Sequence, residues 1–196
     1  MRHLLVLLHR WFGLAAALVL FIAGLTGAVI SWDHELDEWL NPQLFHAKAA
    51  GPPRPALELA SRLEAADPRL RVRFLPLAVE PGHSLTLFVE ARLDPATGKP
   101  YPLDFNQVAL DPVTGEILGK REWGRISLDR ENLLPFLYKL HYSLHLPDGF
   151  GLELGVLFMG IVAIVWVFDT LIALWISFTS RQTWRQSFRF RWQAGG

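Results

Sequence analysis

Three histidines occupy positions where an imidazole ring could hold a metal-containing cofactor. His9 lies in LHRWFG, residues 8–13, and His141 and His145 lie in LHYSLHL, residues 140–146. Residues four apart share one face of a helix, so His141 and His145 are predicted to point the same way. Imidazole nitrogens ligate haem iron and single metal ions. Because amphipathic rings also settle at membrane interfaces, a purely anchoring role is the alternative for each histidine.

Asp169 is a candidate of a different kind because it interrupts an apolar run, WVFDTLIALW, residues 166–175. A charged side chain within a membrane helix costs roughly 2.5–3.5 kcal/mol even on insertion scales, so such residues commonly have a partner and a function. The alternative is a place near the membrane surface, towards Arg181, where the carboxylate could reach the headgroups. Glu153 lies at the other end of the apolar segment 151–178, nearer the outer membrane surface, and is predicted to have no special role.

The other histidines and the missing motifs narrow the chemistry further. Four histidines have no comparable setting and are expected to be solvated: His3, His34, His46 and His83. The chain has no cysteine, which excludes disulfides, thiolate metal sites and a cysteine nucleophile. Phosphate-binding glycine loops and the HExxH and GxSxG motifs do not occur either. Chemistry based on histidine is therefore the main candidate.

The composition and the placement of charges point towards a membrane. Of 196 residues, 51% are hydrophobic and 19% are charged, and the formal net charge is zero. Ordinary domains carry about 25% charged residues. This balance excludes a disordered chain and a basic protein that binds nucleic acid. All acidic residues lie between Asp33 and Asp169, whereas both ends of the chain are basic.

Two apolar segments, residues 11–32 and 151–178, are long enough to cross a bilayer as helices. A cleaved signal peptide is the alternative for the first, but its apolar stretch is longer than the usual 7–15 residues. The basic flanks, residues 1–10 and 179–196, are expected in the cytoplasm by the positive-inside rule. The sequence thus predicts an inner-membrane protein with both termini cytoplasmic and residues 33–150 periplasmic.

The periplasmic segment is predicted to hold a small α+β domain. Residues 33–55 are expected to be a linker, and residues 56–122 the domain, with its helix at 56–66. Leu57, Ala60 and Leu63 recur at helical spacing within that helix. Alternating or turn-flanked patterns predict strands within 70–79, 84–93, 104–110 and 111–119. Residues 123–150 are expected to form an amphipathic interfacial segment with a helix over 132–146, which completes an α+β membrane protein.

Several of these motifs together carry a family resemblance that spans almost the whole chain. LHRWFG, then GLTG at 24–27 and ELDEWLNP at 35–42, resemble the opening of the PepSY-associated transmembrane family. DPVTGEILG at 111–119 resembles the end of a PepSY module. YKLHYSLHL at 138–146 and WVFDTLIALW resemble the second membrane helix of that family. The resemblance implies two membrane helices that flank a PepSY-like domain.

The same resemblance implies an activity and a cofactor. Family members include membrane reductases of ferric siderophores, which are similar to b-type cytochromes. It implies haem b held through His9 and His141, with His145 as an alternate ligand, and a ferric chelate as the substrate for iron uptake. Longer members carry further helices, so this chain is expected to match their N-terminal half or a short relative. Each iron then needs a second ligand from further helices or a second subunit.

A non-enzymatic role is the competing interpretation. PepSY modules resemble inhibitory or regulatory domains of peptidases. The periplasmic domain could therefore bind a protein partner such as a peptidase, while the helices only anchor it in the lipid bilayer. The histidines discriminate between the two interpretations, because an anchor needs neither His9 nor His141.

Overall fold

The computed structural model describes residues 2–177, which form two compact units. The first unit, here called the helix pair, comprises residues 2–26 and 140–177 of the described chain. The second, here called the sheet domain, comprises residues 27–139. The predicted basic tail, residues 179–196, lies outside the described residues.

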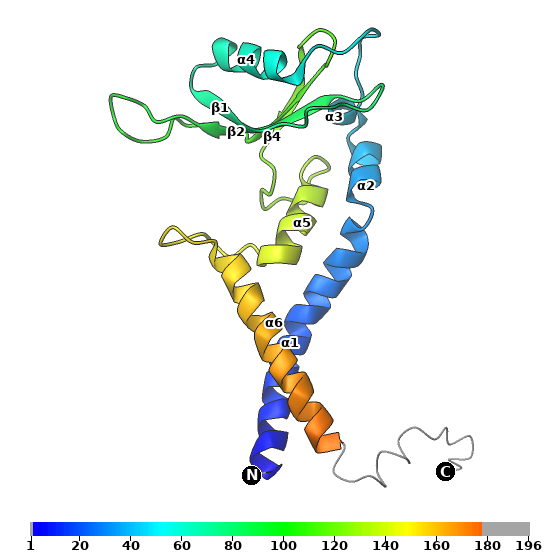
Figure 1. Cartoon of the computed structure of the whole chain (residues 1–196), viewed down its shortest axis with the longest axis vertical. Helices are drawn as coiled ribbons and strands as arrows, with labels where there is room; N and C mark the ends of the chain where they lie inside the picture. Colours follow the sequence, from blue (N-terminus) through cyan, green and yellow to red (C-terminus); the bar gives the residue numbers. More distant parts are fainter. Residues whose placement is uncertain (1, 178–196) are drawn as a thin grey trace, which may run out of the picture. The chain divides into compact units, whose positions relative to one another are not determined.

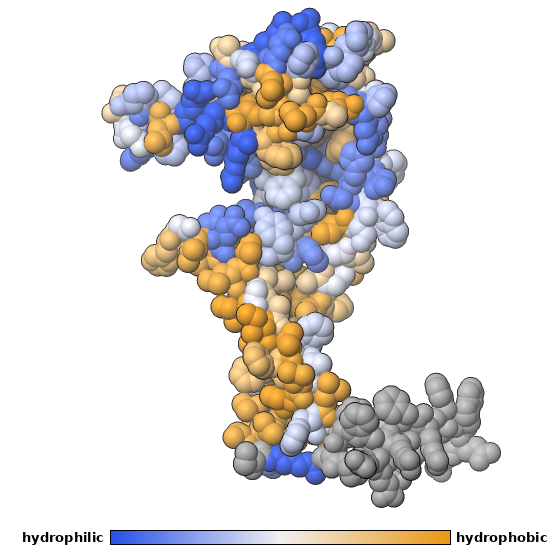
Figure 2. All heavy atoms as spheres, in the orientation of Figure 1, coloured by the Kyte–Doolittle hydropathy of each residue, from blue (hydrophilic) through white to orange (hydrophobic). Residues whose placement is uncertain are grey.

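Two long apolar helices dominate the helix pair (Figure 1), α1 (Arg2–Ile30) and α6 (Leu154–Ser177). Both pass the length and hydropathy test for a membrane span, with only 11% and 6% of the tested windows buried. A core helix of a soluble protein would be mostly buried within its own chain, whereas these helices leave most of their apolar side chains uncovered. Figure 2 shows this apolar surface along α6. Helix α1 extends beyond the predicted span, back to Arg2.

The sheet domain is built on a four-stranded antiparallel sheet in the order β1-β2-β3-β4. Its strands follow the chain order: β1 (Leu70–Phe74), β2 (Leu85–Ala91), β3 (Gln107–Leu110) and β4 (Ile117–Arg121). Strand β1 is shorter than the predicted 70–79 because Pro76 has no amide hydrogen to donate to the ladder. The glycine of DPVTG, Gly115, has a φ of 81° and makes the turn between β3 and β4.

Helix α4 (Ala56–Ala66) covers one face of the sheet and forms the apolar core with it. Leu85 and Leu87 of β2 are fully buried on that face, opposite Leu110 and Val108 of β3. The helix occupies its predicted range, and Ala60 and Leu63 of the predicted stripe are buried, but Leu59 takes the place expected for Leu57. Leu59 is buried at 1% exposure, whereas Leu57 is 64% exposed.

The opposite face of the sheet is covered by α2 (Asp33–Leu40) and α3 (Pro42–Phe45). Both helices lie inside residues 33–55, so the prediction of a linker over that whole range was wrong. The segment folds because it has something to cover: Leu44 of α3 packs directly over Gly119 of β4. With both faces covered, all four residues of β3 are buried.

Helix α5 (Leu133–Ser143) joins the sheet domain to the helix pair, and its first residues belong to the sheet domain. It ends three residues earlier than the predicted 146. Leu144 and His145 both have positive φ, 51° and 54°, which no α-helix contains. The predicted sharing of one helix face by His141 and His145 was therefore wrong, because His145 lies beyond the helix.

Candidate functional site

His9 and Asp169 meet between α1 and α6 within the helix pair. The Nδ1 atom of His9 lies 3.0 Å from each carboxylate oxygen of Asp169. Asp169 is only 7% exposed, and His9 is partly exposed. This contact supplies the partner that a buried carboxylate requires, so the alternative of an isolated group reaching for the headgroups is not needed. Arg181, the other group considered, lies outside the described residues.

The contact also fixes which ring nitrogen of His9 carries hydrogen. A carboxylate only accepts hydrogen bonds, so Nδ1 of His9 is the donor and Nε2 is left as the atom that can ligate a metal. Ligating histidines commonly donate their other N–H to a carboxylate in this way, which orients the ring and raises its basicity. The His9–Asp169 pair therefore has the chemistry of a supported ligand.

Space beside His9 is kept open by a small residue. Gly13 lies one helical turn after His9, and a Cβ there would stand 3.3 Å from Asp169 Oδ2. A largely open groove of about 640 Å³ begins at this point, lined by α1 residues from His9 to Leu20 and by Trp166 and Asp169 of α6. Its lining is mostly apolar, and its volume falls in the range of small-molecule and cofactor sites.

His141 is oriented by the backbone of α1. Its Nδ1 lies 2.8 Å from the carbonyl oxygen of Ala23 and 3.4 Å from Thr26 Oγ1. Since a carbonyl oxygen can only accept, Nδ1 donates and Nε2 again holds the lone pair. Thr26, one of the small residues of α1, is 5% exposed at this contact. His141 therefore has the same tautomer as His9, with hydrogen on Nδ1. Its acceptor is the backbone carbonyl of Ala23, whereas the acceptor of His9 is the carboxylate of Asp169.

The turn after His141 is packed against the start of α6. A Cβ at Gly155 would lie 2.3 Å from the carbonyl oxygen of Ser143, so only glycine fits there. This close approach holds the end of α5 against the start of α6. His145 follows in that turn with a left-handed backbone, so its ring leaves the chain in a different direction from that of His141.

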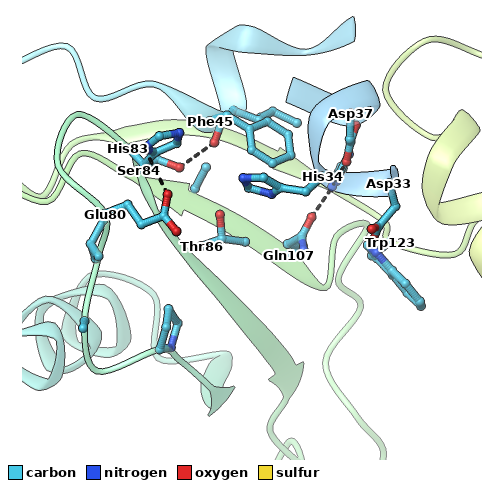
Figure 3. Close-up of a pocket in the computed structure, with 17 residues that line it drawn as sticks. Asp33, His34, Asp37, Phe45, Glu80, His83, Ser84, Thr86, Gln107 and Trp123 are labelled. Carbon is cyan, nitrogen blue, oxygen red and sulfur yellow. Dashed lines mark hydrogen bonds and ion pairs between the residues drawn. The ribbon is translucent and has the colours of Figure 1, made fainter. Parts of the chain in front are cut away.

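A second group of functional side chains lies in the sheet domain, around a cavity of about 410 Å³ between the sheet, α2 and α3. Figure 3 shows His34 beside Phe45 over the sheet, with Gln107 pointing up from β3. Asp37 at the base of the cavity binds Arg121 through two contacts, Nη1–Oδ1 at 3.0 Å and Nη2–Oδ2 at 2.6 Å. Arg121 also donates from Nε to Gln107 Oε1 at 2.5 Å.

Three histidines that were expected to be solvated gather at the edge of this cavity. His46 and His83 each place Nε2 3.4 Å from Glu38 Oε1, and the rings of His34 and His83 lie 6.2 Å apart. His34 and His46 are exposed, as expected, whereas His83 is partly buried, and the clustering of the three is what the prediction of a linker over 33–55 does not reveal. A spacing of four between His34 and Glu38 is the signal that could have revealed the cluster, had the segment been recognised as a helix.

The DPVTG turn has a structural role. Asp111 is 1% exposed, and its carboxylate accepts backbone N–H groups of Lys48 and Ala49 on one oxygen and of Val113 and Thr114 on the other. Burial raises the pKa of Asp111, but these four bonds together outweigh burial and hold its pKa at about 2. Asp111 thereby ties the proline-rich segment after α3 to the sheet.

The family described as the PepSY-associated TM region matches residues 6–195, almost the whole chain. The protein belongs to this family, as its motifs indicated. With its two apolar helices and its antiparallel sheet domain, it is an α+β membrane protein, which confirms the predicted fold class. A search of curated proteins found no match.

Proposed function

We propose that this protein transfers electrons across the bacterial inner membrane through haem b and reduces ferric siderophores or other ferric chelates in iron uptake. One observation carries the proposal: His9 and His141 each have Nδ1 held by an acceptor and Nε2 left for a ligand. An anchoring helix requires neither arrangement. Bound haem would supply a one-electron couple in a largely apolar setting.

The two histidines would serve different irons. Fourteen residues of α1 separate His9 from Ala23, the contact of His141, which is about 21 Å along a helix. His9 would hold one haem near the N-terminal end of α1, oriented by Asp169 and given room by Gly13. His141 would hold the other, oriented by Ala23. A second axial ligand for each would come from another subunit or from further helices.

The direction of transfer follows from the proposed topology. By the positive-inside rule, the basic flanks would put the His9 end on the cytoplasmic side and the sheet domain in the periplasm. An electron from a reduced donor would enter at the His9 end and leave at the His141 end. Ferric iron would then accept one electron and become ferrous, which binds hard oxygen ligands more weakly and leaves the chelate.

Absorption spectroscopy of the full-length protein in detergent tests the cofactor. We expect a b-type Soret band and α-band, and reoxidation of the dithionite-reduced protein by a ferric siderophore without oxygen. His9→Ala and His141→Ala should each remove about one haem equivalent, and His145→Ala should remove less. His3→Ala, on the same helix but fully exposed, is the control and should keep the full spectrum.

Two results would contradict the proposal: a purified protein without haem, or unchanged haem content in both the His9→Ala and the His141→Ala variants. Either result would favour the periplasmic binding module, with the helices as its anchor. Binding partners captured by the sheet domain would then become the relevant measurement.

Single cysteines test the topology, because the natural chain has none. Ala96→Cys lies on an exposed turn of the sheet domain and should react with an impermeant thiol reagent in intact spheroplasts. His3→Cys, at the other end of α1, should react only after lysis. The reverse pattern would overturn the proposed orientation.

A further inference from the structure

A histidine and a carboxylate are presented together by helix α2. His34 and Glu38 are four residues apart in this helix, so their side chains lie on one face. The ring of His34 packs edge-on against Phe45, with the centroids 5.3 Å apart, which limits its orientations. The helix is itself fixed to the sheet through the buried contacts of Asp37 with Arg121.

Two further histidines are brought to the same place by backbone pairing. His46 and His83 face each other in a short antiparallel bridge, with ring centroids 5.8 Å apart. Ser84 N donates to Phe45 O at 2.7 Å, and Ala47 N donates to Gly82 O at 2.9 Å, one on each side of the pair. Residues distant in sequence are thus held beside Glu38 by main-chain hydrogen bonds rather than by flexible side chains.

The distances from His46 and His83 to Glu38 are too long for good hydrogen bonds, but they suit a metal ion bound between the side chains. Nε2 of His46 and Nε2 of His83 each lie 3.4 Å from Glu38 Oε1, beyond the usual 2.7–3.2 Å of an N–H···O hydrogen bond. A tetrahedral ion with ligands at about 2.05 Å separates those ligands by about 3.4 Å. The ligand atoms of His34, Glu38 and His83 all lie within 4.8 Å of one another, and His46 joins this group through its 3.4 Å contact with Glu38.

An unpaired buried atom points to the same conclusion. Nδ1 of His83 is buried and makes no hydrogen bond within residues 2–177. Glu80 Oε2 lies 3.9 Å from it, on an exposed side chain that can turn towards the ring. Figure 3 shows Glu80 and His83 facing each other at the edge of the cavity. If Nε2 of His83 binds a metal, Nδ1–H becomes a donor to Glu80, the supporting contact that ligating histidines usually have.

We propose that His34, Glu38, His46 and His83 form a binding site for one divalent first-row transition-metal ion, with Zn²⁺ as the best fit. Three imidazoles and one carboxylate are the mixed nitrogen and oxygen set that such ions prefer, and the exposed His46 would turn towards the other three ligands to complete a four-coordinate site. The ion joins α2 to the bridge between His46 and His83. The site shares no residue with the proposed haem ligands, so its test does not depend on whether the protein binds haem.

Metal titration of the full-length protein tests this site, after chelator treatment and removal of any affinity tag. We expect one Zn²⁺ per chain by calorimetry and by elemental analysis, and visible Co²⁺ bands of tetrahedral intensity. His83→Ala and His34→Ala should each weaken Zn²⁺ binding at least about 100-fold, the upper range for losing even an outer-shell partner. Haem absorbance should stay unchanged in both variants.

Matched variants keep the test decisive. Glu35→Gln removes a carboxylate from an exposed position of the same helix and should leave Zn²⁺ affinity unchanged. Glu38→Gln removes a ligand without changing side-chain volume, so weakened binding with unchanged circular dichroism supports the site even if His83→Ala unfolds. Failure of the natural protein to bind Zn²⁺ or Co²⁺, or equal binding by the Glu38→Gln and Glu35→Gln variants, would overturn the proposal.

Discussion

Asp169 in the helix pair and Asp37 in the sheet domain are buried to the same extent, at 7% and 6% exposure. Each is paired with a basic residue far away in the sequence. Their partners differ, however: Asp37 binds Arg121, whereas Asp169 binds His9. An arginine is always charged and offers only donors, whereas a histidine that gives Nδ1–H to a carboxylate still has Nε2 available.

The surroundings of Asp37 and Asp169 differ in the same way as their partners. Asp37 also accepts a hydrogen bond from Asn41 at 2.7 Å, and Arg121 donates further to Gln107 and to the carbonyl oxygen of Glu131. These bonds join α2 to the sheet and to the segment before α5. Asp169 instead lies beside Gly13 and an open cavity. The Asp37 pair is therefore a structural connection, whereas the Asp169 pair leaves Nε2 of His9 available for the proposed ligand.

The largest effect is expected from breaking the Asp37 pair. Arg121→Met leaves the buried carboxylate without its cation and should lower the free energy of unfolding of the sheet domain by about 3–5 kcal/mol. Hydrogen exchange of the β3 and β4 amides in the full-length protein measures this loss. Arg71→Met is the control, because its pair with Glu90 is largely exposed and should contribute less than about 1 kcal/mol.

A double variant separates charge burial from packing. Arg121→Met combined with Asp37→Leu removes both charges and should recover most of the lost stability. If the double variant is as unstable as Arg121→Met alone, the loss comes from the hydrogen bonds of Arg121 to its other partners, and the interpretation of an uncompensated charge is wrong.

Asp111 extends the comparison to a buried carboxylate held by backbone N–H groups alone. Its folded-state pKa of about 2 lies below the usual 3.8, so its contribution is complete above about pH 4 and is lost as the pH falls towards 2. Asp111→Asn should cost about 2 kcal/mol at neutral pH and flatten the stability curve in that window. Chemical denaturation at several pH values measures both effects.

The chain contains a matched control for Asp111. Asp94 begins the similar turn DPATG, but it is partly exposed and its carboxylate accepts hydrogen bonds only from Ala96 and Thr97 of its own turn among the bonds described. Asp94→Asn should therefore have a much smaller effect on stability than Asp111→Asn.

Some pH dependence of stability should persist in every variant, because hydrogen bonds from Arg69 and Ser127 lower the pKa of Asp67 and Asp129 as well. Equal losses for Asp94→Asn and Asp111→Asn would contradict the anchoring role.

The smallest change is expected from removing only the charge of Asp169. Asp169→Asn can still accept a hydrogen bond from His9, so the proposed haem should remain but bind about 10–100-fold more weakly, or show a shifted potential. Redox titration measures the haem potential, and haem retention during dilution measures the haem affinity. Glu153→Gln, at an exposed position before α6, should change neither quantity. Identical behaviour of the two variants would mean that Asp169 has no supporting role.

Regular patterns in the sequence predicted the elements well, for reasons that individual residues illustrate. Leu85, Leu87 and Val89 alternate with outward residues and form one buried face of β2, as a period of two requires. The apolar runs predicted the long helices, and LHRWFG and YKLHYSLHL predicted the family. The sequence pattern did not predict the helix that contains His34, because this short, polar helix depends on packing against the sheet rather than on its own periodicity.

The sequence by itself determined the two apolar helices, the antiparallel domain between them and the residue types available for chemistry. These follow from local periodicity, charge and turn residues, which each act over a few positions. Only the tertiary structure decided that Asp169 meets His9, that Ala23 orients His141, and that three histidines surround Glu38. Such pairings join residues far apart along the chain, and they depend on how helices cross and strands align, which no local pattern encodes.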